Sequence, residues 1–416
     1  MQNEDHLPLK GITVLELGHT VMGPTCGLVL ADMGADVYKV ERTGKGDDTR
    51  YLEGFGAGFF TYFNRNKKSI SLDLKSEKGK DILLRMVEHA DVLIENFGPD
   101  TTNRLGMAYE TCRERNPLLI YCSLKGFMPG PYEKRPALDE VVQMMGGLAY
   151  MTGPKGQPLR AGASITDIMG GTFGVIGILA ALYRRQFSGR GEFVQAALFE
   201  SVAFLVGQHM AIADITGVAP PPMPERGRAW SVYDLFETAD GDKVFIGVSS
   251  DRHWERMCDV FEFRDWAGDA RLSSNQSRID EREWLLPELQ RRLGRLKKAD
   301  LMALAEKAGI PFAPIARPQD LRNDAHLNAS GGLVEISLPG GGVTKLPKIP
   351  LQLNHASFGL RSNPPGVGEG SLEIYQRIGL SEADIAQLLQ EEVIQLSEKE
   401  KTFLVMRCKD VATSDH

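Results

Sequence analysis

Short apolar runs alternate with longer amphipathic stretches over the first two hundred residues, and this alternation constrains the fold more than any other feature. The runs at 12–17, 36–41 and 91–96 are rich in aliphatic residues and typical of β-strands, whereas 78–90 repeats its apolar positions at helical spacing. Strands that alternate with helices form right-handed βαβ units and a mainly parallel sheet. Because the strand centres are apolar throughout, we expect helices on both faces of this sheet.

A second pattern begins at the proline-rich segment 220–224, which predicts a linker or an extended crossing. The segment 233–249 predicts a hairpin, because Asp-Gly separates two alternating runs. A chain of 416 residues is too long for one ordinary core. We therefore expect a large α/β domain at 1–225, completed by 326–416, and a small α/β domain at 226–325.

Composition and charge narrow the classes of function. Hydrophobic residues make up 42% and charged residues 25% of the chain, and the apolar stretches are interrupted before the roughly 18 residues of a membrane helix. The first residues lack the pattern of a signal peptide. A formal net charge of −7 argues against a nucleic-acid partner, and a phosphate-bearing ligand would need a local cluster of Lys and Arg. We expect no membrane partner either.

Cysteine and histidine patterns argue against metal sites. The five cysteines are scattered without a CxxC pair, and none of the eight histidines stands in an HxxxH or HExxH arrangement. This usage fits a reducing compartment, so we expect a cytoplasmic protein with no metal and no tightly bound cofactor.

Familiar nucleotide and hydrolase motifs are missing where the parallel sheet would place them. The first strand-to-helix turn reads ELGHTVMGPTCG, which lacks the GxGxxG fingerprint, and TGKGDDTR from Thr43 lacks the Walker spacing. The chain contains no GxSxG, so a serine hydrolase is disfavoured. A nucleotide would have to be held by side chains and single amides. For Cys26, close to this turn, packing is the favoured role.

The stretch AGASITDIMGGTFGVIGILAALYRR, from Ala161, predicts a long apolar helix with Asp167 at its start. Asp167 could be a helix cap, which is worth about 0.5–2 kcal/mol. It could instead be an ionised nucleophile, favoured by the helix N-terminus. Gly170 and Gly171 weaken a helix by roughly 1 kcal/mol each, so something is expected to approach its backbone closely.

The chain resembles the class III CoA-transferases, the family of formyl-CoA transferase and carnitine CoA-transferase. The resemblance rests on blocks in the same order: KGITVLELGHTVMGP, DVYKVERTGKGDDTR, FFTYFNRNKKSISLDLKSEKGK, DVLIENFGP, RLGM, SLKGF and the Asp167 helix followed by RRQFSGRGEFV. It implies a Rossmann-like large domain, an interlocked homodimer, and CoA or acyl-CoA and a small carboxylic acid as substrates. It also implies that Asp167 is the nucleophile, working through an aspartyl anhydride and an aspartyl-CoA thioester.

The resemblance further implies a set of CoA-contacting positions. Phosphate binding by Arg and Lys is chemically apt. Glu140 matches an acidic active-site residue of formyl-CoA transferase, and Ala137 stands where that enzyme has a CoA-contacting lysine. The implied CoA-binding residues are His19, Thr20, Val21, Arg42, Leu72, Lys75, Asn96, Phe97, Arg104 and Lys125.

Three questions stay open at this stage. An acyl-CoA racemase of the same fold is disfavoured, because the His of its GHD triplet falls on Leu138 and leucine cannot exchange a proton. A non-catalytic CoA-binding paralogue is the other alternative. Arg226 and Arg228 are candidates for binding a second carboxylate, which would favour a dicarboxylic acceptor, although an exposed basic linker is at least as good an interpretation.

Overall fold

The computed structural model describes residues 7–225 and 229–414, and the chain divides into two compact units. The larger comprises Met1–Pro224 and Asn328–His416, and the smaller comprises Glu225–Leu327.

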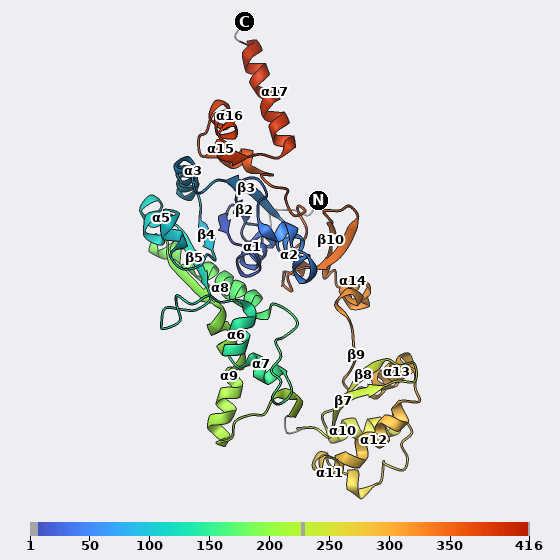
Figure 1. The fold of residues 1–416 in the computed structure, drawn as a ribbon. Coiled ribbons are helices and arrows are strands. Elements are labelled where there is room, and N and C mark those ends of the chain that lie inside the picture. Colours follow the sequence, from blue (N-terminus) through green and yellow to red (C-terminus); the bar gives the residue numbers. More distant parts are fainter. Residues whose placement is uncertain (1–6, 226–228, 415–416) are drawn as a thin grey trace. The chain divides into compact units, whose positions relative to one another are not determined.

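A seven-stranded sheet forms the centre of the larger unit (Figure 1), with the order β14-β3-β2-β1-β4-β5-β6. Every strand pair is parallel except the edge pair β14–β3. The predicted mainly parallel α/β sheet is confirmed. Its strands are β1 (Thr13–Leu17), β2 (Asp36–Glu41), β3 (Lys67–Leu72), β4 (Val92–Glu95), β5 (Ile120–Lys125), β6 (Phe193–Ala197) and β14 (Ile394–Gln395).

Helices cover both faces of this sheet, as the apolar strands require. Val14 and Leu15 are neighbours in β1, yet they belong to two different hydrophobic cores, because successive side chains point to opposite faces. The core of Leu15 includes residues of α3 (Glu77–Glu88), α5 (Tyr109–Arg115), α15 (Ser371–Arg377) and α16 (Glu382–Gln390). The core of Val14 includes residues of α1 (Met22–Asp32), α6 (Asp139–Met145), α8 (Ile165–Ser188) and α9 (Leu198–Thr216).

The C-terminal part of the chain completes the larger unit. Ser381 and Asp384 form a capping box that starts α16. The last sixteen residues, which carried no clear sequence pattern, lie mostly in a long helix, α17. The other elements are α2 (Phe59–Phe63), α4 (Thr101–Arg104), α7 (Leu148–Thr152), α14 (Ala325–Ala329), β10 (Leu333–Ser337), β11 (Val343–Pro347), β12 (Gln352–Leu353), β13 (Ala356–Ser357) and α17 (Glu398–Ser414).

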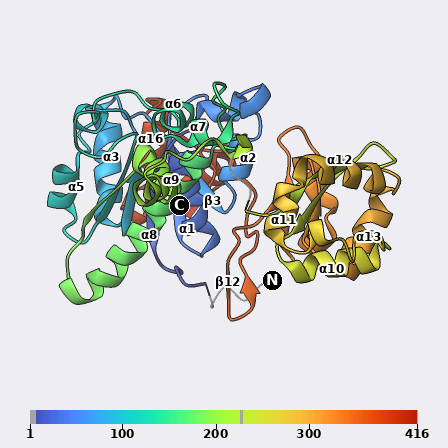
Figure 2. The same cartoon turned by 90° about the horizontal axis from the view of Figure 1, so that it is seen from below.

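The smaller unit is a three-stranded antiparallel sheet with helices packed on it (Figure 2). The hairpin predicted at 233–249 is confirmed as β7 (Val232–Glu237) and β8 (Lys243–Val248), joined through Gly241 with φ +78°. The remaining elements are β9 (Phe312–Pro314), α10 (Asp251–Val260), α11 (Asn275–Asp280), α12 (Arg282–Leu293) and α13 (Lys298–Ala308).

Two helices of the larger unit, α8 and α9, are long and apolar enough to cross a membrane by length and composition. The expectation that every apolar stretch falls short of that length was therefore wrong. Much of α8 is core, because Val175, Ile178 and Ala181 are buried against the sheet. A buried core helix can have the same length and composition as a membrane span, so these two properties alone do not distinguish them.

Candidate active site

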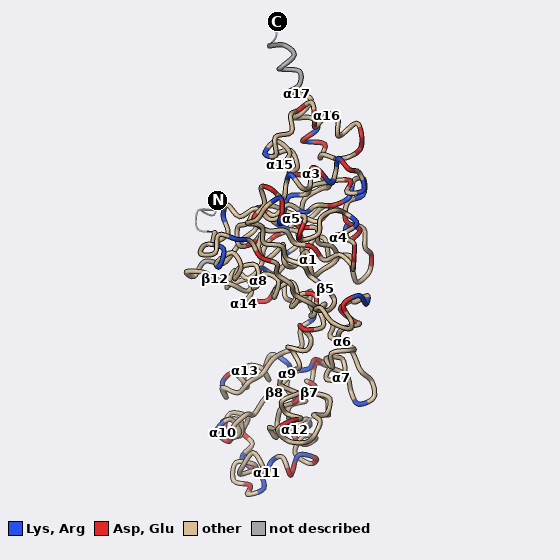
Figure 3. The backbone as a smooth tube through the Cα atoms, turned by 90° about the vertical axis from the view of Figure 1, so that its left-hand side faces the viewer, with Lys and Arg blue, Asp and Glu red and all other residues tan. Residues whose placement is uncertain are grey.

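The carboxyl ends of the parallel strands bring most of the predicted CoA-binding residues to one edge of the sheet. His19, Arg42, Lys75 and Asn96 follow the ends of β1, β2, β3 and β4, and Lys125 is the last residue of β5. The strand order reverses between β1 and β4, and such a reversal opens a ligand-binding crevice beyond the strand ends. Acidic and basic residues are interspersed along the chain (Figure 3), so an anionic ligand at this edge would need local cations.

Hydrogen bonds join the loops after β1 and β4 at the point where the strand order reverses. The amide of His19 donates to the side-chain oxygen of Asn96, and the side-chain amide of Asn96 donates back to the His19 carbonyl, both at 2.9 Å. The rings of His19 and Phe97 stack with their centroids 6.1 Å apart. Thr20 has φ +65°, an uncommon conformation for a residue with a side chain that often occurs at ligand-binding loops.

Two of the predicted binding residues turn their side chains into the protein. Val21 is buried with Leu28 and Phe63, and Leu72 belongs to a core of the sheet. Each is only 1% exposed, backbone included, so neither is accessible to a ligand at the sheet edge in this structure. Sequence reasoning named these positions without distinguishing side-chain from backbone contact.

The cations at the edge differ in how firmly they are held. Arg42 is exposed, pairs with Asp48, and donates from Nε to the Gly46 carbonyl at 2.9 Å. Lys75 and Arg104 are exposed. Because these side chains are exposed near the strand ends, they are able to form charge-assisted hydrogen bonds with the phosphates of a bound ligand.

Lys125 is held more tightly than the other cations. Its ammonium group lies 2.8 Å from the Glu95 carboxylate and donates to the Phe97 carbonyl at 2.8 Å. Glu95 in turn accepts from the Phe97 amide at 2.9 Å. Lys125 therefore orders the β4 loop.

Asp167 lies in the first turn of α8 and is partly buried. This helix connects β5 to β6, so its N-terminus lies at the carboxyl edge of the sheet. Ile168, the next residue, packs against the cluster that contains Val21. The topology thus brings Asp167 to the same edge as the first strand-to-helix turn.

The glycines after Asp167 allow helix α1 to approach. A side-chain carbon on Gly170 would lie 2.4 Å from the Met22 methyl group, and one on Gly171 would lie 2.6 Å from the Met22 carbonyl oxygen. A side-chain carbon on Gly174 would lie 2.8 Å from a Leu124 methyl carbon. The expected close approach to the helix backbone is confirmed, and the approaching group is α1.

A carboxylate outside the helix caps α8. Asp139 Oδ1 accepts from the Thr166 amide at 2.8 Å and from its hydroxyl at 2.5 Å, and it lies 3.4 Å from the Asp167 amide nitrogen. Its other oxygen accepts from Gln143 at 2.6 Å and lies 3.2 Å from the Arg160 guanidinium. Ser164, the local N-cap residue, makes no side-chain capping bond. Sequence reasoning missed Asp139, although the acidic residue four positions before Gln143 was visible.

The groups around Asp167 shift the pKa of its carboxyl. Burial raises its pKa, the nearby Asp139 carboxylate raises it further, and Arg160 opposes both, so that the pKa of Asp167 lies at about 7. Asp167 is therefore not the fully ionised carboxylate expected at a helix N-terminus, because burial and the Asp139 carboxylate raise its pKa. Near neutral pH the residue exists in both forms.

Glu140 follows Asp139 in α6, and the two carboxylates share the Arg160 guanidinium. Its side chain is 60% exposed and pairs with Arg160 at 2.8 Å. Leu138, at the position of the racemase histidine, is 67% exposed. Ala137 packs near Gly126. Within α6 it is therefore Asp139, not Glu140, that contacts the Asp167 turn.

The remaining residues named from the sequence are Arg226, Arg228 and Cys26. Arg226 and Arg228 lie outside the described residues. Cys26 is buried, and burial raises the pKa of its thiol well above the ordinary range, which fits a packing role. Among the described residues no group of three His, Cys, Asp or Glu side chains is placed to hold a metal ion.

Known proteins resemble this chain in sequence and fold. The family described as CoA-transferase family III matches residues 9–371. The chain is 34% identical over 380 residues to a succinate–glutarate CoA-transferase of Agrobacterium fabrum, covering 88% of this chain and 94% of that protein. It is 32% identical over 409 residues to a formyl-CoA:oxalate CoA-transferase of Rhodopseudomonas palustris, covering 91% and 96%. A CAIB/BAIF family protein from Brucella suis has a similar structure, with a TM-score of 0.80, 32% identity and coverage of 89% and 99%.

These matches extend over nearly the whole chain and agree with the fold. The protein is an enzyme of the acyl-CoA-using transferase class. It belongs to CoA-transferase family III.

Proposed function

We propose that the enzyme moves CoA from an acyl-CoA donor to a small dicarboxylic acid, with Asp167 as the nucleophile. The observation that carries this proposal is the position of Asp167: a partly buried carboxyl in the first turn of α8, at the sheet edge where the cations lie. Its raised pKa means that the ionised form is more basic, and hence more nucleophilic, than an ordinary aspartate.

The reaction would proceed by acyl exchange at this carboxylate. Asp167 attacks the donor thioester carbonyl, which forms a mixed anhydride and expels CoA thiolate. The thiolate attacks the aspartyl carbon, which gives aspartyl-CoA and releases the donor acid. The acceptor carboxylate then attacks aspartyl-CoA, and the thiolate expelled in that step takes the acceptor acyl group from the new anhydride, which regenerates Asp167.

CoA would bind along the carboxyl edge of the large unit. Arg42, Lys75 and Arg104 are the exposed cations suited to its phosphates. The paired loops of His19 and Asn96 would line the path from the nucleotide toward Asp167, and Thr20 and Phe97 belong to the same loops. Lys125 would act by holding the β4 loop, and Val21 and Leu72 by packing in the cores that support these loops.

The names of the relatives support a dicarboxylic acceptor. The Agrobacterium protein is named for succinate and glutarate, and the Rhodopseudomonas protein for oxalate. Succinyl-CoA is therefore the first donor to test. A racemase is disfavoured because Leu138 occupies the position of the proton-exchanging histidine.

We also propose that the enzyme is a cytoplasmic homodimer. Helices α8 and α9 expose large apolar side chains, with Phe187 at 74%, Phe204 at 70% and Ile215 at 84%. An exposed apolar area of this kind commonly marks a protein interface. Mass photometry at nanomolar concentration would test the dimer, and a monomer there would contradict it.

Mass spectrometry tests the transferase reaction. Wild-type protein and Asp167→Asn would be incubated with succinyl-CoA and a panel of mono- and dicarboxylic acids, and new acyl-CoA species recorded. An acceptor labelled with ¹⁸O should leave one labelled oxygen on Asp167, because the bridging oxygen of the second anhydride stays with the enzyme. A labelled product with an unlabelled Asp167 would contradict the anhydride route. CoA binding without any new thioester would favour the non-catalytic alternative.

A further inference from the structure

A cluster of buried charged side chains lies beneath the first strand-to-helix turn of the large unit. The side chains of Glu16, Lys39 and Lys67 are fully buried. Glu16 lies 3.5 Å from the Lys39 ammonium nitrogen and 2.7 Å from that of Lys67. Burying ions is costly, and a buried ion pair adds little to stability beyond what apolar residues would give. The cluster therefore calls for another role.

Both lysines donate hydrogen bonds to backbone carbonyls of the segment that leads from β1 into α1. Lys39 donates to the Gly18 carbonyl at 2.7 Å, and Lys67 donates to the Pro24 carbonyl at 2.9 Å. Gly18 and Pro24 bracket His19, Thr20 and Val21. Gly18 begins the loop and Pro24 lies in the first turn of α1 just after it, so buried ammonium groups hold the start of the loop and the start of the helix.

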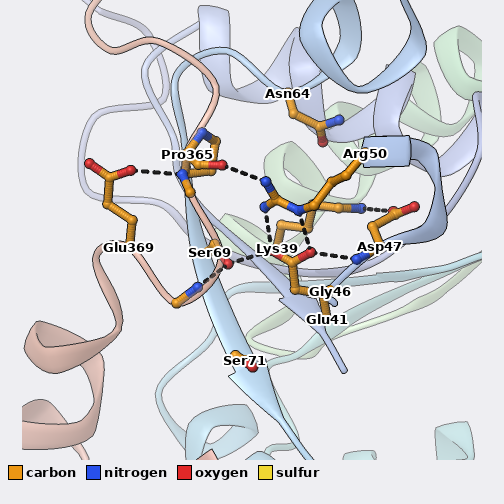
Figure 4. A network of polar contacts seen from close by, with 12 residues as sticks. Lys39, Glu41, Gly46, Asp47, Arg50, Asn64, Ser69, Ser71, Pro365 and Glu369 are labelled. Carbon is orange, nitrogen blue, oxygen red and sulfur yellow. Dashed lines mark hydrogen bonds and ion pairs between the residues drawn. The ribbon is translucent and has the colours of Figure 1, made fainter. Parts of the chain in front are cut away.

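Lys39 also holds the loop that follows β2. Its ammonium nitrogen lies 2.7 Å from the Asp47 carboxylate (Figure 4). Asp47 accepts from the Thr49 amide at 2.8 Å, and its own amide donates to Glu41 at 2.7 Å. Arg42 is bonded to the Gly46 carbonyl beside Asp47. Lys39 thereby fixes the segment that carries Arg42.

Glu41 extends this second loop toward the C-terminal segment. Its carboxylate accepts from Arg50 and from the Ser69 hydroxyl (Figure 4). Arg50 donates to the Pro365 carbonyl at 2.9 Å. The outer end of the loop is therefore anchored, and Lys39 provides its link to the β1 turn.

We infer that Lys39 is a positioning residue that fixes the His19 loop and the Arg42 loop relative to each other for CoA binding. One ammonium group donates to a carbonyl of the first loop and pairs with a carboxylate of the second, so neither loop can shift without breaking a buried, charge-assisted bond. Lys39 itself touches no substrate. The inference rests on the proposed CoA site at this edge.

Asp47→Asn tests the link while keeping its shape. Asparagine retains an oxygen for Thr49 but loses the charge that holds Lys39. Asp32→Asn is the matched control, because Asp32 forms an equally buried pair with Arg65 at the far end of α1. Hydrogen–deuterium exchange of the ligand-free proteins and calorimetric titration with CoA would be measured for both.

Asp47→Asn should speed exchange in peptides covering both 17–25 and 42–51, and should raise the Kd for CoA about tenfold, since hydrogen bonds to charged groups are worth about that factor. Asp32→Asn should lower Tm without either effect. The inference is overturned if only 42–51 exchanges faster, or if both variants weaken CoA binding equally. If the wild-type protein fails to bind CoA, the proposed function fails, while the exchange data still report on the link between the loops.

Discussion

Asp139 and Asp167 face each other across the first turn of α8, with an oxygen of the Asp139 carboxylate 3.4 Å from the Asp167 amide nitrogen. Asp139 caps the helix, and the same negative charge raises the pKa of Asp167. One carboxylate therefore positions the other and also hinders its ionisation. This relationship leads to the first three predictions.

The first prediction concerns the pH dependence of the wild-type enzyme. Only ionised Asp167 can attack a thioester, and its pKa lies at about 7. We expect kcat/KM for the acyl-CoA donor to rise about tenfold per pH unit below that value and to level off above it. A profile that is flat from pH 5 to 8 would show that Asp167 is already ionised in the free enzyme.

The second prediction concerns Asp139→Asn. Removing the charge should lower the pKa of Asp167, because one repulsive neighbour is lost and Arg160 is freed from it. The acid limb of the kcat/KM profile should shift to lower pH. Glu110→Gln serves as the control, since Glu110 is exposed on α5 and pairs with Arg113, and its profile should stay in place.

The third prediction concerns stability. The folded-state pKa of Asp167 is above the value of 3.8 expected in the unfolded chain, so ionisation opposes folding. The penalty builds up between pH 4 and 7 and is complete above that range. Asp167→Asn should therefore be inactive but should raise Tm at pH 8, by about 1–2 °C per kcal/mol relieved, with no gain at pH 4. An equal change at both pH values would contradict this account.

The fourth prediction concerns the glycine contact. Alanine at Gly171 would place a carbon 2.6 Å from the Met22 carbonyl oxygen, and backbone cannot move aside easily. Gly171→Ala should cost about 1–3 kcal/mol of stability and lower kcat by displacing Asp167. Gly268→Ala adds its carbon in open space and should change neither value. Differential scanning calorimetry and initial rates measure both effects.

The fifth prediction concerns CoA phosphate binding. Arg104→Gln should raise KM for an acyl-CoA about three- to tenfold, because a phosphate contact is lost. With an acyl-pantetheine donor, which lacks the nucleotide, the variant and the wild-type enzyme should have the same KM. Arg113→Gln is the control, since Arg113 is equally exposed on α5 but pairs with Glu110 away from the strand ends. Equal losses with both donors would place Arg104 outside the phosphate site.

The sequence by itself determined the features that depend on local backbone geometry. Aliphatic runs such as that of β1 predicted the parallel sheet, because a two-residue side-chain period allows both faces to be buried. The Asp-Gly pair predicted the β7–β8 hairpin, because the turn of a hairpin depends on the few residues that form it. The motif around Asp167 pointed to the candidate nucleophile.

Only the tertiary structure decided the contacts between distant segments. Asp139 reaches a helix that begins 26 positions later in the chain, whereas Glu140 pairs with the Arg160 side chain. Lys39 becomes a link between two loops only once β1 and β2 pair. The partner of Gly171 proved to be α1. Such contacts depend on which elements pack together, and no local periodicity encodes that choice.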